Sequence, residues 1–249
     1  LCWSSCTNEV DEFIGNVEPS TRSVSTALNA NLASLFTGGA PTLTSAEIKE
    51  VNDAYAKMTS INCYRNIDEA VRNKTSYAGT IFLDDTYASA YFRKGSLAFP
   101  PYGILASSME HEFIHMYQRD VQGKKVDTDK EKRDTGMMEF ELAFYQGIIR
   151  YIHAGYSWTF KGEDGDPSYQ SLWTSGLTDP SLIPQYEREF QTYVASICAN
   201  GKPTSIDINE FVKWSNIFGE YSRGYSGKGY KFGNYDYGTS CINSLLKLY

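Results

Sequence analysis

Hydrophobic residues recur along most of this chain with the spacing of amphipathic helices. The period is clearest over residues 104–118, which contain no Pro or Gly and whose apolar stripe consists of Leu105, Met109, Phe113 and Met116. Similar spacing predicts further helices over residues 25–36, 45–60, 67–73, 137–154, 185–200, 207–219 and 242–248. Thr44 and Glu47 have the spacing of a capping box at the start of the second of these helices. We therefore expect a mainly helical chain.

Shorter segments of other character separate these helices. Residues 79–84 form a β-branched and aromatic run that is typical of a strand, and residues 91–99 could be a second strand or a loop. The mixed charges of residues 121–135 predict a solvated loop, and the glycines and prolines of residues 155–184 predict a long loop or insertion. Residues 219–238 are rich in Gly, Ser and Tyr and could form a Tyr-lined loop or irregular strands. The pattern predicts an α+β fold, mainly helical, with a small mixed β-sheet.

Composition excludes several classes of protein. The chain has 249 residues, of which 41% are hydrophobic and 21% charged, and this balance is typical of a globular protein. A net charge of −7 and a pI near 5.1 argue against nucleic acid as the main partner, because binding phosphate requires a basic surface. No apolar run approaches the ~20 residues that a transmembrane helix needs.

The cysteines and the first residues bear on location. The chain begins Leu1-Cys2 without Met, so we expect an upstream segment to have been removed, and a signal peptide could belong to it. We therefore expect a secreted, periplasmic or cell-surface protein. The five cysteines, an odd number, could be free or could form one or two disulfides, and their spacing favours neither alternative.

The strongest chemical signal lies in the helix predicted over residues 104–118. It contains His111-Glu112-Phe113-Ile114-His115, which uses two of the chain's three histidines. Residues four apart lie on one face of an α-helix, so His111 and His115 can bind one metal ion together. Glu112 lies close to the same face, where its carboxylate can reach a water on that metal. This spacing is typical of a zinc hydrolase, with the Glu as general base.

The motif resembles that of the zincin metallopeptidases. The resemblance covers residues 103–154 and, loosely, the strand predicted over residues 79–84. It implies a Zn²⁺ cofactor, a third protein ligand downstream, and an edge strand that pairs with an extended substrate. The remaining histidine, His153, lies near the end of the next helix, so a carboxylate is the better third ligand. The site is thus similar to that of the gluzincins, which use two His and one Glu.

Two carboxylates of the helix predicted over residues 137–154 compete for that role. Glu139 and Glu141 diverge by ~200° around a helix, so both cannot face one metal. Glu141 shares its face with apolar residues, which favours an inward direction, whereas the face of Glu139 could be the solvent side. However, Ala143 follows Glu139 by four residues and would let this helix approach the metal helix closely.

The resemblance also bears on this choice. The segment is similar to the Glu-x-Glu-Ala segment of gluzincin-like families, from which it departs at Leu142. We expect Glu139 as the third ligand, and Glu141 as the alternative ligand or as a partner that orients a histidine.

The resemblance further implies a single zincin-like catalytic domain over residues 1–249. Its upper part, residues 1–120, would hold the small sheet above the active-site helix. Its helical lower part, residues 121–249, would include the insertion at 155–184, placed over the site, and the Tyr/Gly-rich tail.

The implied activity is that of a zinc metallopeptidase that hydrolyses a peptide or protein substrate. A Tyr or His stabilises the oxyanion in gluzincins, and the candidates here are His153, Tyr145 and Tyr117. An alternative is a zincin-like zinc-binding surface or interaction protein with little or no catalysis. The intact Glu112 argues against this alternative, because a structural zinc does not need that carboxylate.

Overall fold

The computed structural model describes residues 27–124, 133–153, 178–198, 201–222 and 224–249. These residues form eight α-helices and a three-stranded mixed sheet, so the predicted α+β, mainly helical class is confirmed. They group into two compact units that divide between Phe113 and Ile114, within one helix. We call residues 27–113 the N-terminal unit, and the described residues from Ile114 onward the C-terminal unit. The single catalytic domain divided near residue 120 stays a prediction.

Three helices make up much of the N-terminal unit: α1 (Ala30–Leu35), α2 (Ser45–Thr59) and α3 (Asn62–Lys74). The predicted capping box of α2 is confirmed. The hydroxyl of Thr44 accepts from the N–H of Glu47, and the Glu47 carboxylate accepts from the N–H of Thr44. The prediction for α3 was too short, because Cys63 and Tyr64 extend its buried face beyond the expected start at Ile67.

A buried carboxylate joins α2 to α3. Asp68 is 1% exposed, and its Oδ2 accepts hydrogen bonds from the Tyr55 hydroxyl at 2.8 Å and from Nε of Arg72 at 2.9 Å. Burial raises the pKa of Asp68, although both partners favour the charged carboxylate. The two helices are therefore held by a polar contact as well as by apolar packing.

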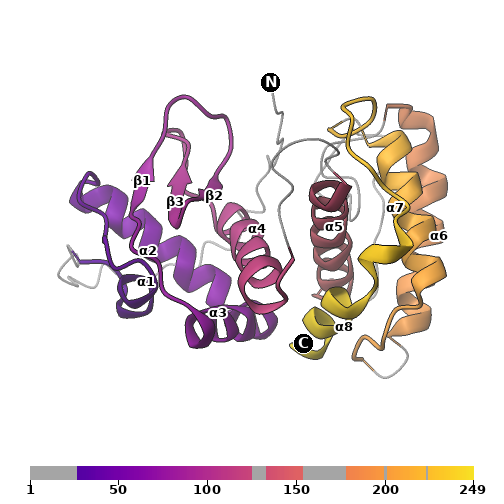
Figure 1. Ribbon diagram of the computed structural model, residues 1–249, viewed down its shortest axis with the longest axis horizontal. Helices are drawn as coiled ribbons and strands as arrows, with labels where there is room; N and C mark the ends of the chain where they lie inside the picture. Colours follow the sequence, from indigo (N-terminus) through magenta and orange to yellow (C-terminus); the bar gives the residue numbers. More distant parts are fainter. Residues whose placement is uncertain (1–26, 125–132, 154–177, 199–200, 223) are drawn as a thin grey trace, which may run out of the picture. The chain divides into compact units, whose positions relative to one another are not determined.

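The sheet consists of β1 (Ile81–Leu83), β2 (Tyr91–Arg93) and β3 (Ser96–Phe99), in the order β1-β3-β2. β3 pairs parallel with β1 and antiparallel with β2. The strand predicted over 79–84 is thus confirmed, and residues 91–99 form a hairpin. Lys94 and Gly95, at its tip, both have positive φ, as a tight two-residue turn requires. Figure 1 shows the three strands together on one side of α1, α2 and α3.

The outer edge of β1 is partly occupied by the chain itself. The N–H of Thr37 donates to the carbonyl of Tyr77 at 2.8 Å, and the N–H of Ile81 donates to the carbonyl of Gly39 at the same distance. Thr80 and Asp84 bond toward β3, so the backbone groups of Ile81 and Leu83 face the outer edge. Of these two residues, Ile81 already has a hydrogen-bond partner on the outer edge, the carbonyl of Gly39.

The C-terminal unit is built around α5 (Arg133–His153). It packs against α6 (Ile183–Ile197), α7 (Ile208–Tyr221) and α8 (Ser240–Lys247), and Figure 1 shows α5, α7 and α6 running side by side. The core of this unit is aromatic, and its fully buried rings are Phe140, Phe144, Tyr145, Phe190, Phe211, Trp214 and Phe218. Residues four apart on α5 therefore supply one wall of the core, as Phe140 and Phe144 illustrate.

Two predicted helix boundaries were wrong, and both involve glycine. The predicted helices over 137–154 and 207–219 place Gly136 before a helix and Gly219 at the end of one, but both glycines lie inside α5 and α7. A Cβ on Gly136 would lie 2.7 Å from the carbonyl oxygen of Lys231, and a Cβ on Gly219 would lie 2.2 Å from Cδ2 of Phe232. These glycines therefore allow the segment around Lys231 and Phe232 to lie directly on both helices.

Two predicted loops also need correction where the structure describes them. Residues expected in the charged loop at 121–135 are partly helical: a π-helix covers Tyr117–Val121, and α5 starts at Arg133. Of the insertion predicted at 155–184, residues 155–177 lie outside the described residues. The rest forms the 3₁₀ helix Pro180–Leu182 and the start of α6, so the loop ends earlier than expected.

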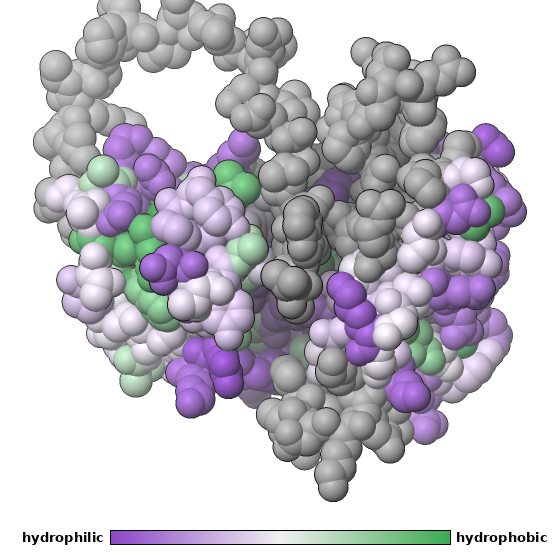
Figure 2. Space-filling model, turned by 90° about the horizontal axis from the view of Figure 1, so that it is seen from above, coloured by the Kyte–Doolittle hydropathy of each residue, from purple (hydrophilic) through white to green (hydrophobic). Residues whose placement is uncertain are grey.

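The surface and the cysteines add two facts. In Figure 2, the described surface seen from above is mostly hydrophilic or neutral, with smaller hydrophobic patches. None of the described helices has the length and apolar character needed to cross a bilayer. Cys198 and Cys241 are buried free thiols and Cys63 is also buried, whereas Cys2 and Cys6 lie outside the described residues.

Candidate metal-binding site

The helix α4 (Ala106–Met116) carries both histidines of the motif. Its apolar residues face the interior, since Met109, Phe113 and Met116 are fully buried. His111 and His115 follow each other by one turn on another face, with 31% and 18% of their side chains exposed. The predicted helix is thus confirmed and leaves the two imidazoles accessible, but Leu105 of the predicted apolar stripe precedes α4 and is 47% exposed.

Glu139 of α5 completes a group that could hold a metal ion. Its Oε1 lies 3.4 Å from Nε2 of His115. His111, His115 and Glu139 each offer one ligand atom, and these atoms lie within 4.8 Å of one another. Two imidazoles and one carboxylate are a donor set that suits a divalent transition metal such as zinc. Among the described residues, His111, His115 and Glu139 form the group of potential ligands whose donor atoms lie this close together.

Glu112 lies beside this group without belonging to it. Its Oε1 is 4.0 Å from Nε2 of His111, and the residue is only 5% exposed. A carboxylate at this distance from a ligand nitrogen can hydrogen-bond to a molecule held next to it. Glu112 is therefore a nearly buried carboxylate next to the group that could hold a metal ion.

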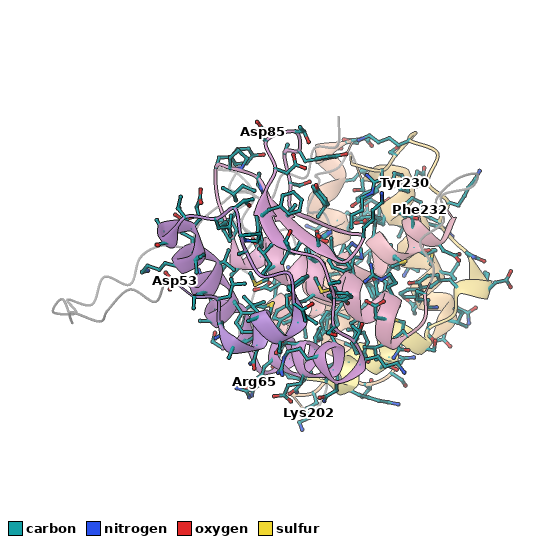
Figure 3. All side chains as sticks on the ribbon, turned by 60° about the vertical axis from the view of Figure 1, so that its left-hand side comes forward. Asp53, Arg65, Asp85, Lys202, Tyr230 and Phe232 are labelled. Atoms are coloured by element: carbon teal, nitrogen blue, oxygen red, sulfur yellow. The ribbon has the colours of Figure 1, made fainter. Side chains whose placement is uncertain are left out.

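Tyr225 is a residue of the site that sequence reasoning missed. Its hydroxyl donates to Oε2 of Glu139 at 2.9 Å. The ring packs against Phe218 and Phe232, with centroids 5.0 Å and 6.3 Å away, and Figure 3 shows Phe232 near Tyr230. The only sequence signal was the tyrosine-rich composition of residues 219–238, in which no single tyrosine stands out.

Glu141 occupies a different position from Glu139. It is fully buried, and its Oε2 accepts from Nε2 of Gln118 at 2.8 Å and from the Tyr237 hydroxyl at 2.9 Å. Burial raises the pKa of Glu141, while Cys241, Gln118 and Tyr237 act in the opposite direction. Glu141 is therefore outside the group that could hold a metal ion, and Gln118 lies between it and His115.

Gln118 lies between His115, which is beside Glu139, and the buried carboxylate of Glu141. Its Oε1 lies 2.8 Å from Nδ1 of His115, and its Nε2 donates to the carbonyl oxygen of Met138 at 3.0 Å as well as to Glu141. Gln118 is fully buried in the π-helix that follows α4. The Gln118 amide therefore joins the turn that follows α4 to α5.

The other predicted site residues are placed as follows. Tyr145 is fully buried on α5, about 120° around the helix from Glu139, and Tyr117 is 4% exposed in the π-helix. Burial raises the pKa of Tyr117. His153 is the last residue of α5, and its side chain lies outside the described part of the structure. A role of these residues in stabilising an oxyanion stays a prediction.

Comparisons with protein-family models, with curated proteins and with solved structures found no match. The geometry of His111, His115 and Glu139 is therefore the observation on which a function can be argued.

Proposed function

We propose that this chain is a zinc-dependent peptidase with a zincin-like, gluzincin-type site. His111, His115 and Glu139 would bind the zinc, and Glu112 would act as general base. The observation that carries the proposal is the convergence of three ligand atoms within 4.8 Å of one another. The carboxylate of Glu112 adjoins the same group.

Zinc fits the donor set better than a hard cation does. Two imidazole nitrogens and one carboxylate oxygen match the His₂Glu ligands of hydrolytic zinc sites, whereas Ca²⁺ and Mg²⁺ prefer oxygen ligands only. When bound, zinc lowers the pKa of a coordinated water to about 7 and polarises a peptide carbonyl as a Lewis acid.

Glu112 would carry the protons of the reaction. Its carboxylate accepts a proton from the attacking water while the water oxygen bonds to the carbonyl carbon. The same carboxyl group then passes a proton to the nitrogen of the leaving amine as the C–N bond breaks. The position of Glu112, one residue after His111 and 4.0 Å from its Nε2, supports this role.

The two ligands of the C-terminal unit are held by hydrogen bonds from their neighbours. Tyr225 donates to Oε2 of Glu139, and so Oε1 is the oxygen turned toward His115. Gln118 contacts Nδ1 of His115, and so Nε2 is the nitrogen turned toward Glu139. Ligands fixed in this way lose less conformational entropy when they bind a metal.

The proposed substrate is a peptide or protein segment in extended form. We expect such a segment to pair with the strand at 79–84. The N–H of Ile81 in that strand already donates to the carbonyl of Gly39, which leaves fewer positions for this pairing. Leu83 is then the position of β1 at which a substrate strand could add its backbone hydrogen bonds.

A paired substitution tests the proposal. We expect Glu112→Gln to retain zinc but to lose peptide cleavage by about 10²–10⁴-fold, the usual contribution of a general base. Glu110→Gln, the same change two residues earlier on α4, serves as the matched control and should leave cleavage unchanged. Zinc would be counted by elemental mass spectrometry, and cleavage would be followed on a mixed peptide library. Normal turnover by Glu112→Gln would end the proposal.

A further inference from the structure

The orientation of the Gln118 amide can be assigned from its contacts. One end of the amide lies 3.0 Å from the carbonyl oxygen of Met138. A backbone carbonyl has no hydrogen to donate, so the group facing it must be the amide NH₂. The second hydrogen of this NH₂ points to Oε2 of Glu141, 2.8 Å away. Turning the amide over would place its oxygen, which has no hydrogen to donate, against the Met138 carbonyl oxygen, and both hydrogen bonds from Gln118 would be lost.

This orientation determines which nitrogen of His115 carries the proton. With the NH₂ group fixed toward Met138 and Glu141, the amide oxygen is the atom that lies 2.8 Å from Nδ1 of His115. An oxygen can only accept, so Nδ1 must bear the hydrogen. A neutral imidazole protonated at Nδ1 has its lone pair on Nε2. That nitrogen is the one 3.4 Å from Oε1 of Glu139.

We propose that Gln118 is a positioning residue, which fixes His115 as the Nδ1–H tautomer and thereby presents the Nε2 lone pair to a metal. The statement about the metal rests on the proposed function, whereas the statement about the tautomer does not. Glu141 and the Met138 carbonyl act through Gln118, because they hold its amide in the one orientation that accepts from His115.

The surroundings of Gln118 suit this role. Gln118 and Glu141 are both fully buried, so their hydrogen bonds do not compete with solvent. The Tyr237 hydroxyl donates to the same oxygen of Glu141, and Lys124 lies over the Tyr237 ring at 3.8 Å and donates to the carbonyl of that residue. Gln118 also lies in a π-helical turn, a rare backbone form that is often found at functional sites.

The tautomer can be measured without metal or substrate. The chain has three histidines, so long-range ¹H–¹⁵N spectra of the metal-free protein give three imidazole patterns, which single His→Asn variants assign. At a pH about two units above the usual histidine pKa, where the ring is neutral, we expect His115 in the Nδ1–H form. An Nε2–H pattern for His115 in the wild type would overturn the inference.

A matched pair of variants tests the cause. Gln118→Met keeps the length of the side chain but removes the acceptor, and Gln122→Met makes the same change four residues later, where the amide contacts Tyr117 instead. We expect Gln118→Met alone to shift His115 toward the Nε2–H form. We also expect it to weaken zinc binding by about 10–100-fold in competition with a chromophoric chelator.

The outcomes separate the two proposals. Unchanged zinc affinity in Gln118→Met, despite an altered tautomer, would contradict the positioning role. A wild-type protein that shows the Nδ1–H form but binds no zinc would contradict the proposed function and leave the assignment of the tautomer standing.

Discussion

The hydroxyl of Tyr225 lies 2.9 Å from Oε2 of Glu139, although 86 positions separate the two residues in the sequence. The contact places a residue of the Tyr/Gly-rich segment beside a candidate metal ligand. It also explains how one helix can turn a single carboxylate oxygen toward His115, since the other oxygen is engaged by the phenol.

We therefore predict that Tyr225→Phe weakens zinc binding by about tenfold, at the lower end of the range for residues that orient metal ligands. The ring is kept, so its packing against Phe218 should persist and the melting temperature of the metal-free protein should change little. Tyr230→Phe, in the same segment, is the control. Chelator competition measures the affinity, and equal affinities for the two variants would exclude the predicted role.

Gly219 should not tolerate a side chain, even though it lies within a helix. Gly219→Ala gains about 1 kcal/mol of helix propensity, but the new Cβ overlaps the Phe232 ring, and such overpacking costs about 1–3 kcal/mol. We expect a net loss of stability in chemical denaturation. In a Phe232→Ala background the ring is gone and only the Cβ of residue 232, 2.9 Å from the new Cβ, remains, so the same substitution should cost less. A cost that is equal in both backgrounds would show that the ring is not its source.

Asp68 should make the stability of the metal-free protein depend on pH. Its folded-state pKa is raised by burial, so the folded state holds the proton more tightly than the unfolded chain, whose pKa is about 3.9. The stability that this proton contributes is complete below about pH 3.9 and is lost as the pH rises through the folded-state pKa. Asp68→Asn removes the titration.

We therefore expect the stability of Asp68→Asn, relative to wild type, to increase as the pH rises from about 4 to 7. Urea titrations in the presence of a chelator measure this difference. The opposite trend would mean that the Arg72 contact, rather than burial, dominates the pKa of Asp68.

The cysteines of the described residues should be unreactive in the folded protein. Burial raises the pKa of Cys198 to about 11, and burial together with the Glu141 carboxylate raises the pKa of Cys241 as well. At pH 8 we expect iodoacetamide to modify Cys198 at least ten times more slowly in the native protein than in guanidinium, because the thiolate is roughly a thousandth of the population. Peptide mass spectrometry measures both rates, and equal rates would contradict the burial of this thiol.

The parts of the site that the sequence predicted are those set by local geometry. His111 and His115 lie four residues apart, and a helix of any context places such residues on one face. The capping box of Thr44 and Glu47 is equally local, and so is the helical period that surrounds the motif. Each depends on neighbours within one or two turns.

The choice between the two carboxylates of α5 could not be made in this way. Glu141 has the apolar face, as expected, and it is fully buried, yet Glu139, with 21% of its side chain exposed, is the one beside His115. An inward direction therefore did not imply a metal-facing direction. Where each carboxylate points depends on Gln118 and Tyr225, which come from other elements.

Glycine was the second source of error, because its two uses look alike in a sequence. Gly136 and Gly219 suggested helix boundaries, whereas each provides room for residues around Phe232. A glycine that ends a helix is recognised from its neighbours in sequence, but a glycine that admits another segment is recognised only when that segment is in place.

The most direct test of the metal site is the zinc content of two isosteric variants, Glu139→Gln and Glu141→Gln, compared with wild type by elemental mass spectrometry after dialysis. We predict one zinc per chain in the wild type, loss of zinc from Glu139→Gln, and retention by Glu141→Gln, whose amide oxygen can still accept from Gln118. A wild type without zinc, or loss from Glu141→Gln alone, would contradict the assignment of His111, His115 and Glu139 as ligands.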